Sequence, residues 1–386
     1  MKLSEVVFEC LRFEIIGTPL SDELKTKLQH GIPEKLLKYC KIQDVAHLVS
    51  DALLRNGFLE KGTDDYKGFM AERNMAFFRH EQMRSVLSDL SQTFTKHKIK
   101  HIPLKKAIVG RFYPEGWMRT SCDLDVLVEK KEFSRALKIM REELGYKIDV
   151  KAECDYGLKA PNGFQVEIHF SLVGDMAKQT EKDVLSDVWS NVIDNTVYCQ
   201  TLIDELNYCY TISHVAKHLK SGGCGIKPII DVWVLNNRAK FDKEKRQGLL
   251  KRAGLIAVEK AVLELANVWL FGVEADEVSK DLEHYILAGG VYGSFENKVA
   301  VQQTKLKSKF SYVLERIFLP YRYMVLEYPR VKKHPILYPF YVIKRWFRIF
   351  LKSSRERIAV EIGQTMNDRG GRRKRVKKIL KDLELD

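Results

Sequence analysis

Apolar side chains recur every three or four residues along the first 98 residues, a spacing that predicts amphipathic helices. Pro33 directly follows a glycine-containing turn and marks a helix boundary there. The segment from Asp64 to His97 contains few helix breakers, so we expect it to form one long helix. The positions that carry this periodicity are Val6, Leu11, Ile15, Leu36, Leu37, Val45, Leu48 and Leu53.

The pattern changes at Ile99 and returns to helical spacing after about Gly174. Between them lie short runs typical of strands, with turn residues between them and one amphipathic helix, Lys131 to Leu144, that ends at Gly145. The runs are KIKHIPL, LDVLVE, YGLKA and FQVEIHF. The predicted fold class is therefore α+β, a small mixed β-sheet embedded between helical regions.

Four regions follow from this pattern. We expect an N-terminal helical region at 1–98, a sheet-containing core at 99–174, a helical region at 175–300 that completes a cleft beside the core, and a C-terminal helical region with a tail at 301–386. No internal repeat is visible.

The composition is that of a globular protein. The chain has 386 residues, 45% hydrophobic and 30% charged, which excludes wholesale disorder and a collagen-like repeat.

Its seven cysteines are scattered without a CxxC pair, which favours a reducing compartment over a disulfide framework. Glu5 and Glu9 interrupt the N-terminal apolar stretch, unlike a signal peptide, and no apolar run has the length of a membrane span. We expect a soluble, cytoplasmic enzyme or adaptor.

The net charge of +14 resides in the last 86 residues, which carry 22 Lys and Arg against 8 Asp and Glu. The segment 336–352 interleaves aromatic residues with bases, and 369–378 holds seven bases and no acid. Residues 336–378 could bind nucleic acid through phosphate contacts and base stacking. They could equally lie on an anionic membrane surface, or form a core-facing aromatic helix followed by a solvated tail.

Candidate chemistry centres on Asp123-Leu124-Asp125, which opens a strand continued by three apolar residues. Because side chains alternate along a strand, both carboxylates face the same side, about 6 to 7 Å apart. Two carboxylates so close repel each other unless a divalent cation lies between them. A single DxD is more often a solvent-exposed pair at a strand end, so a further acid is needed to support a metal site.

The later strand supplies that acid. In the run from Phe164 to Phe170, Gln165, Glu167 and His169 alternate with apolar residues, so Glu167 can face the same cavity as Asp123 and Asp125. Three carboxylates holding two metal ions suit phosphoryl or nucleotidyl transfer. We therefore predict Asp123, Asp125 and Glu167 as catalytic residues and as ligands for Mg²⁺ or Mn²⁺.

The segment from Pro103 to Phe170 resembles the nucleotidyltransferase superfamily related to DNA polymerase β. The shared order is L-K-x-A, Y-P, an arginine, D-x-D followed by an apolar strand, a helix, and V-E-I-H. It is most similar to the uncharacterised bacterial branch called nucleotidyltransferase family proteins. The resemblance extends more loosely to His214, His218, Asp231 and the YPRVKKHP segment.

The resemblance implies an NTP substrate and transfer of its NMP group to a hydroxyl acceptor that the sequence does not identify. It implies that Asp123, Asp125 and Glu167 bind the metals, and that Lys105 and Arg119 lie near phosphate. The family has glycine after the lysine, where this chain has Lys106. That lysine could add charge for nucleotide binding or block the approach of phosphate to the backbone.

His214 and His218 are four residues apart on a predicted helix, a spacing that suits two metal ligands, packing or nucleotide contact. We expect Ser221 to Gly225 to form the turn that ends this helix. Cys122 is expected in the core, and Lys217 and Lys220 are expected either on a solvated helix face or in contact with an anion.

Two hypotheses remain. The first is a metal-dependent nucleotidyltransferase with His214 as a further nucleotide contact. The alternative is an inactive module that binds nucleic acid or membrane through its basic C-terminal region.

Overall fold

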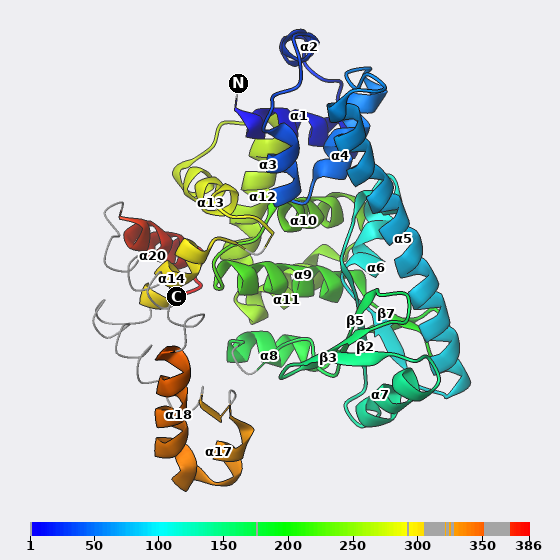
Figure 1. Cartoon of the computed structure of the whole chain (residues 1–386), viewed down its shortest axis with the longest axis vertical. Coiled ribbons are helices and arrows are strands. Elements are labelled where there is room, and N and C mark those ends of the chain that lie inside the picture. Colours follow the sequence, from blue (N-terminus) through cyan, green and yellow to red (C-terminus); the bar gives the residue numbers. More distant parts are fainter. Residues whose placement is uncertain are drawn as a thin grey trace.

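The structure is a computed structural model, and it describes residues 2–174, 177–291, 293–304, 321, 324–325, 328–350 and 371–386 (Figure 1). Five helices form the N-terminal region, as the apolar periodicity predicts. They are α1 (Leu3–Ile16), α2 (Asp22–Gln29), α3 (Leu36–Ile42), α4 (Ala46–Arg55) and α5 (Asp64–Lys96). The long helix expected from Asp64 is α5, whose N-cap Thr63 accepts a hydrogen bond from the Tyr66 amide.

A five-stranded mixed sheet follows, with strand order β1-β2-β5-β4-β3. Its central pair, β2 and β5, is parallel, and the other neighbouring pairs are antiparallel. Helix α7 (Phe133–Glu142) lies between β2 and β3 in the chain. The strands are β1 (His101–Pro103), β2 (Asp123–Val128), β3 (Lys147–Lys151), β4 (Asp155–Lys159) and β5 (Gln165–His169).

The expected strands are confirmed at β1, β2, β4 and β5, and the α+β class is correct. Two features differ from the prediction. Strand β3 carries mostly exposed side chains and so lacks a clear apolar alternation. The region after Gly174 is not wholly helical, because β6 (Val192–Asp194) and β7 (Gln200–Leu202) form a two-stranded sheet whose strands are too short for periodicity to reveal.

The helical regions on both sides of the sheet share one hydrophobic core. Phe8 of α1 stacks on Trp269 of α12 with 4.8 Å between ring centroids, and the Arg12 side chain donates to the Trp269 carbonyl. The helices after the sheet are α8 (Gln179–Leu185), α9 (Asp204–Leu219), α10 (Ile226–Arg238), α11 (Lys243–Ala253), α12 (Ile256–Phe271), α13 (Glu277–Leu287) and α14 (Phe295–Thr304).

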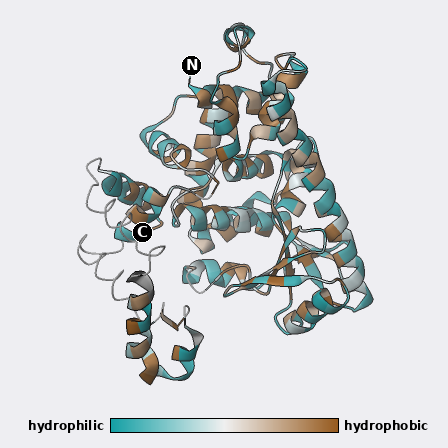
Figure 2. Ribbon diagram, in the orientation of Figure 1, coloured by the Kyte–Doolittle hydropathy of each residue, from teal (hydrophilic) through white to brown (hydrophobic). Residues whose placement is uncertain are grey.

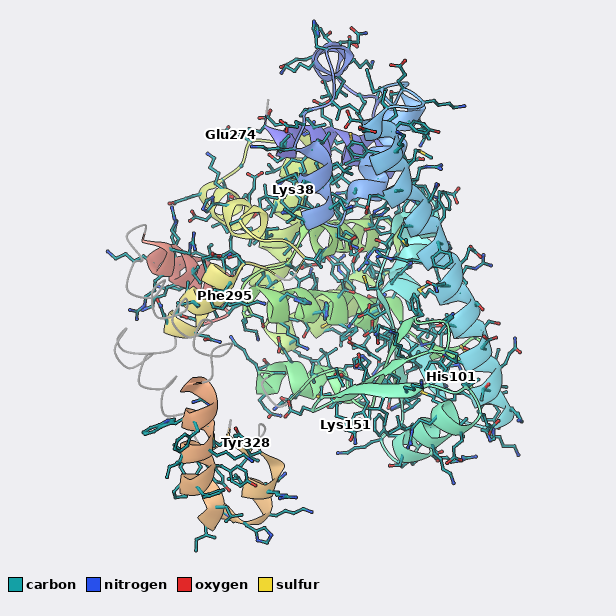
Figure 3. All side chains as sticks on the ribbon, in the orientation of Figure 1. Lys38, His101, Lys151, Glu274, Phe295 and Tyr328 are labelled. Atoms are coloured by element: carbon teal, nitrogen blue, oxygen red, sulfur yellow. The ribbon has the colours of Figure 1, made fainter. Side chains whose placement is uncertain are left out.

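A second core lies between the sheet, α7 and the C-terminal half of α5. Leu124, Val126 and Val128 of β2 point into it, as do Val166 and Ile168 of β5. In Figure 3, His101 of β1 lies against α5, and its Nε2 is 3.0 Å from the Ser91 hydroxyl. One sheet face is therefore sealed by α5 and α7, which leaves the other face for polar side chains.

The C-terminal helix α20 (Arg372–Asp382) packs on the body of the protein. Lys378 Nζ donates to Glu277 (2.7 Å) and Asp281 (2.9 Å) of α13. Residues 371–386 are therefore not the solvated tail considered above, because they bury an apolar face; Arg369 and Lys352 lie outside the described residues. The buried side chains of this segment are Val376, Ile379, Leu380, Leu383 and Leu385.

Helices α17 (Pro329–Lys333) and α18 (Tyr338–Phe350) form a separate pair, joined by the 3₁₀ turn Pro335–Leu337 (Figure 1). In the part of the chain that the structure describes, no helix has the length and apolar character needed to cross a membrane.

Candidate active site

The register of the two parallel strands brings the predicted acids to one face. Asp125 of β2 lies opposite Glu167 of β5, and Asp123 lies opposite Gln165. His169 lies opposite Leu127, two positions beyond Glu167 on the same face. Because Leu124 and Val126 point into the core behind the sheet, this polar face is the one turned towards α9.

Asp125 is the centre of the site. Its side chain is 3% exposed, and its Oδ1 lies 2.6 Å from Lys105 Nζ and 2.9 Å from His169 Nε2. His169 Nε2 also lies 3.5 Å from Glu167 Oε2, and its Nδ1 is 3.8 Å from an Asp155 oxygen. A buried carboxylate is thus neutralised by two basic groups.

The pKa values of these groups reflect that pairing. Burial alone would raise the pKa of Asp125, but the Lys105 ammonium and the His169 ring outweigh it and hold that pKa far below its usual range. Burial opposes the charged form of His169, yet hydrogen bonds to Asp125 and Glu167 raise its pKa to about 9. With these pairings both groups are charged at neutral pH. A metal ion that binds the His169 ring would replace the proton that the ring carries.

Lys105 reaches Asp125 through an unusual backbone conformation. Its φ is 47° and its ψ is −119°, a region that residues other than glycine rarely occupy. The strained residue directly precedes the short helix α6 (Lys106–Val109) and sends its side chain towards the carboxylates. Non-glycine residues in such conformations cluster at functional sites, where the surrounding structure maintains them.

Lys106 faces the opposite way. Its side chain is 4% exposed, and its Nζ is buried without a hydrogen-bond partner among the described atoms. Burial, together with the charges of Arg119 and Lys227, lowers its pKa to about 7. The structure therefore places Lys106 in the interior and away from the carboxylates, whereas the sequence analysis expected it to contact the nucleotide. Its helical backbone also needs no glycine.

A cavity of about 440 Å³ opens in front of the carboxylates. Lys105, Glu167 and His169 form part of its wall, and Asp125 lies directly behind Lys105 and His169. The β3–β4 turn contributes Glu153 and Cys154, and the first residue of β4 contributes Asp155. Helix α9 contributes Tyr210, Ser213, His214, Lys217 and, at its end, Lys220.

His214 lines this cavity, while His218 lies behind it with its Nε2 3.3 Å from that of His214. Burial and the nearby Lys105 charge lower the pKa of His214 well below its usual value and that of His218 to about 4. Two neutral imidazoles at this distance fit a shared hydrogen bond. They are not part of any grouping of three potential metal ligands among the described residues.

Such a grouping exists around Asp125. Ligand atoms of Asp125, Glu167 and His169 all lie within 4.8 Å of one another. Two hard carboxylate oxygens suit Mg²⁺ or Mn²⁺, and the imidazole nitrogen of His169 is a softer third donor. The donor set fits the divalent metal that the sequence predicts, although its third member here is His169 rather than Asp123.

Asp123 lies at the start of β2 and is partly exposed. Its Oδ1 accepts a hydrogen bond from the Ser121 hydroxyl at 2.5 Å, and it contributes to the raised pKa of Lys105, after the larger effect of Asp125. Asp123 therefore faces the site from one edge without joining the Asp125 grouping.

Arg119 does not line the cavity. Its Nε lies 2.7 and 2.8 Å from the two carboxylate oxygens of Asp231 on α10, which also accept a hydrogen bond from the Tyr113 hydroxyl. The Arg119–Asp231 pair can be buried because each charge is paired with the opposite one. By this pairing Arg119 holds the loop before Asp123 against α10. Arg119, expected near phosphate, therefore lies outside the cavity wall.

The same interior region contains Lys227, which pairs with Asp44 and donates to the Thr120 carbonyl and hydroxyl. We define the interior cluster as Asp44, Lys106, Arg119, Lys227 and Asp231. It fixes residues 119–120 from behind and so positions the start of β2.

Sequence reasoning did not assign a role to His169, although its alternation with Glu167 was visible. Its position two residues after a predicted ligand, on the same strand face, was the signal that could have identified it. Cys122 was expected in the core but is exposed, because it lies in the loop before β2 rather than within the strand alternation.

Two solved structures resemble part of this chain at low similarity. A search of curated proteins gives no match. A solved structure of the antibiotic-resistance factor ANT(2'')-Ia is similar at 9% identity and a TM-score of 0.33, covering 44% of this chain and 90% of that one. An antigenic nucleotidyltransferase-like protein from Paracoccidioides brasiliensis is similar at 15% identity and a TM-score of 0.30, covering 47% and 93%.

The family model described as "uncharacterised nucleotidyltransferase" matches residues 31–271, which include every site residue discussed above. That range is more than half of the chain. The protein therefore belongs to the family of uncharacterised nucleotidyltransferases.

Proposed function

We propose that the protein transfers an NMP group from an NTP to a hydroxyl acceptor and releases pyrophosphate, with catalytic Mg²⁺ or Mn²⁺ ions bound at Asp125, Glu167 and His169. The observation that carries this proposal is the buried, charge-balanced Asp125 with Glu167 and His169 at the wall of a cavity of about 440 Å³. Such a cavity has the size of a small-molecule site. Asp123 is the residue that would extend the ligand set to a second ion.

When bound, the metal ions would neutralise the triphosphate and favour ionisation of the attacking hydroxyl. The residues of this chain have separate tasks. Asp125 keeps its negative charge at any physiological pH, since its pKa lies far below the usual range. Glu167 is partly exposed at the cavity wall and so can accept a proton from an acceptor hydroxyl or bind a metal.

Nucleotide phosphates would be bound by the basic part of the cavity wall. Lys105 projects a charged ammonium next to Asp125, and Lys217 of α9 adds a second, more exposed one. His214 is neutral in this environment and offers a hydrogen bond rather than a charge. Lys106 and Arg119 are assigned to the interior cluster instead of to the phosphates.

The alternative, an inactive module, drew its support from Lys106 in place of the family glycine. That support weakens, because Lys106 turns its side chain away from the cavity and leaves Lys105 free to reach Asp125. Three convergent ligands also have no purpose in a protein that binds only polyanions. We further infer a cytoplasmic location from the reducing-compartment composition and the NTP substrate.

Isothermal titration of each of the four NTPs, with and without Mg²⁺, tests the proposal. The protein should bind at least one NTP in a Mg²⁺-dependent manner, and Asp123→Asn/Asp125→Asn should abolish that binding. Asp149→Asn on the exposed strand β3 is the matched control, because it removes one carboxylate from the same sheet away from the cavity. Absence of binding for all four NTPs would favour the inactive module.

A further inference from the structure

Helix α18 exposes a stripe of large apolar side chains. Phe340 is 64% exposed, Ile343 is 52% and Phe347 is 73%, and Ile336 in the preceding turn is 88% exposed. Their spacing of four, three and four residues places them along one side of the helix. Figure 2 shows hydrophobic residues along α18, which lies beside α17 among the described residues.

The opposite side of α18 is already occupied. Tyr341 packs on Tyr328 with 4.8 Å between ring centroids, and Tyr338 lies 5.5 Å from Tyr321; Figure 3 places Tyr328 between α17 and α18. Arg345 is 9% exposed. The helix therefore partly buries Tyr338 and Tyr341 and buries Arg345, while Phe340, Ile343 and Phe347 face outward, the reverse of a helix adapted to water.

The charges beside this stripe have one sign. From Tyr328 to Phe350 the sequence contains no Asp or Glu. Arg330, Lys332 and Lys333 on α17 are exposed, and so is Lys344, which lies next to the stripe with its Nζ 5.7 Å from the Tyr341 ring centroid. An apolar stripe flanked by Lys and Arg side chains is complementary to a partner that has an apolar interior and negative charges at its surface.

We infer that α18 binds an anionic lipid bilayer, lying in the plane of the interface with Ile336, Phe340, Ile343 and Phe347 inserted. The bases of α17 and Lys344 would then contact lipid headgroups. Nucleic acid fits this surface less well, because the isoleucine side chains of the stripe cannot stack on nucleobases. The Lys and Arg side chains also lie beside the stripe instead of along it. The inference is independent of the proposed nucleotidyl transfer.

Vesicle co-sedimentation of the full chain tests this inference, with vesicles of phosphatidylcholine alone and of phosphatidylcholine with phosphatidylglycerol. The protein should bind the anionic vesicles, and binding should weaken as salt is added. Phe340→Glu/Phe347→Glu should reduce binding by about tenfold or more, since two inserted rings become charged groups. Phe78→Glu is the matched control, because Phe78 on α5 is similarly exposed (57%) but lies outside the stripe.

Other results would overturn the inference. Equal vesicle binding by the double variant and the parent protein would show that the stripe is not inserted. A shift of single-stranded RNA by the parent protein, lost in the double variant without any vesicle binding, would assign the surface to nucleic acid. Ultracentrifugation could also show that the parent protein self-associates and that the double variant is monomeric, again without vesicle binding. That result would assign the stripe to contact with a second copy of the chain.

Discussion

Two neighbouring lysines lie in opposite electrostatic environments. Lys105 ends on the buried carboxylate of Asp125, which raises its pKa against the effect of burial. Lys106, one residue later, is buried among Arg119 and Lys227 without a hydrogen-bond partner, and its pKa falls to about 7. The first side chain faces the cavity and the second faces the interior cluster, on opposite sides of the loop between β1 and β2.

The two lysines thus belong to two groups of charged residues, one at the cavity and one that holds the neighbouring loop in place. At the cavity, Lys105 and His169 lie within hydrogen-bond distance of Asp125 and balance its charge. Lys105 and His169 also line a cavity large enough for a small-molecule ligand. The interior cluster contains charges that hold residues 119–120 in place and that do not line the cavity. A sequence motif alone does not distinguish them, because Lys105, Lys106 and Arg119 all precede the two aspartates within one segment.

The largest expected effect separates the two lysines directly. Lys105→Met should lower affinity for Mg²⁺·NTP about 100-fold, because it removes a preorganised charge at the phosphates and leaves Asp125 with a single basic partner. Lys106→Met should change that affinity by less than about threefold. Isothermal titration of both variants measures the contrast, and equal losses in the two would contradict the assignment of opposite roles.

Asp231→Asn should destabilise the protein by about 3 to 5 kcal/mol, because Arg119 is then buried without its counter-charge. Tyr113→Phe removes only one hydrogen bond to Asp231 and should cost about 1 kcal/mol. Urea denaturation of the two variants gives both values. A loss below 1 kcal/mol for Asp231→Asn would mean that the interior cluster does not hold the loop.

The buried ammonium of Lys106 predicts a dependence of stability on pH. Its pKa is about 7 in the folded protein and has its ordinary value of about 10.4 in the unfolded chain. Between these values the unfolded chain binds a proton that the folded protein does not, so this group's contribution to stability rises as pH rises from 7 to about 10. Lys106→Met should therefore stabilise the protein by about 3 kcal/mol near pH 7, and less at pH 9.5.

Urea denaturation of the parent protein and Lys106→Met at the two pH values measures this difference. A stability gap that stays constant between pH 7 and pH 9.5 would show that Lys106 keeps its proton in the folded state.

The smallest expected effect concerns Lys217, which is exposed on the α9 side of the cavity. Lys217→Ala should weaken NTP binding about fivefold at low salt and less at high salt, because its charge is screened by solvent. Lys251→Ala on α11 removes another exposed lysine, one that does not line the cavity, and should leave affinity unchanged. Equal effects of both variants would indicate a general charge contribution.

Much of the site was predictable, because β-strand alternation is strict. The two-residue period placed Asp125 and Glu167 on one face, and the observed register aligns them. Fold class followed from the change of period at Ile99. What the sequence did not reveal depends on contacts between distant residues. Arg119 pairs with Asp231, 112 residues away, and the exposed strand β3 is defined by its neighbours rather than by its own pattern.

The most direct test of the central claim is pulsed EPR of Mn²⁺ bound to the protein with an NTP. The account predicts ³¹P coupling from the nucleotide and ¹⁴N coupling from His169, with the nitrogen signal absent in His169→Gln and both signals unchanged in Lys106→Met. In Asp125→Asn both couplings should disappear. Retention of protein-bound Mn²⁺ with unchanged couplings in Asp125→Asn would contradict the claim that this cluster is the catalytic metal site.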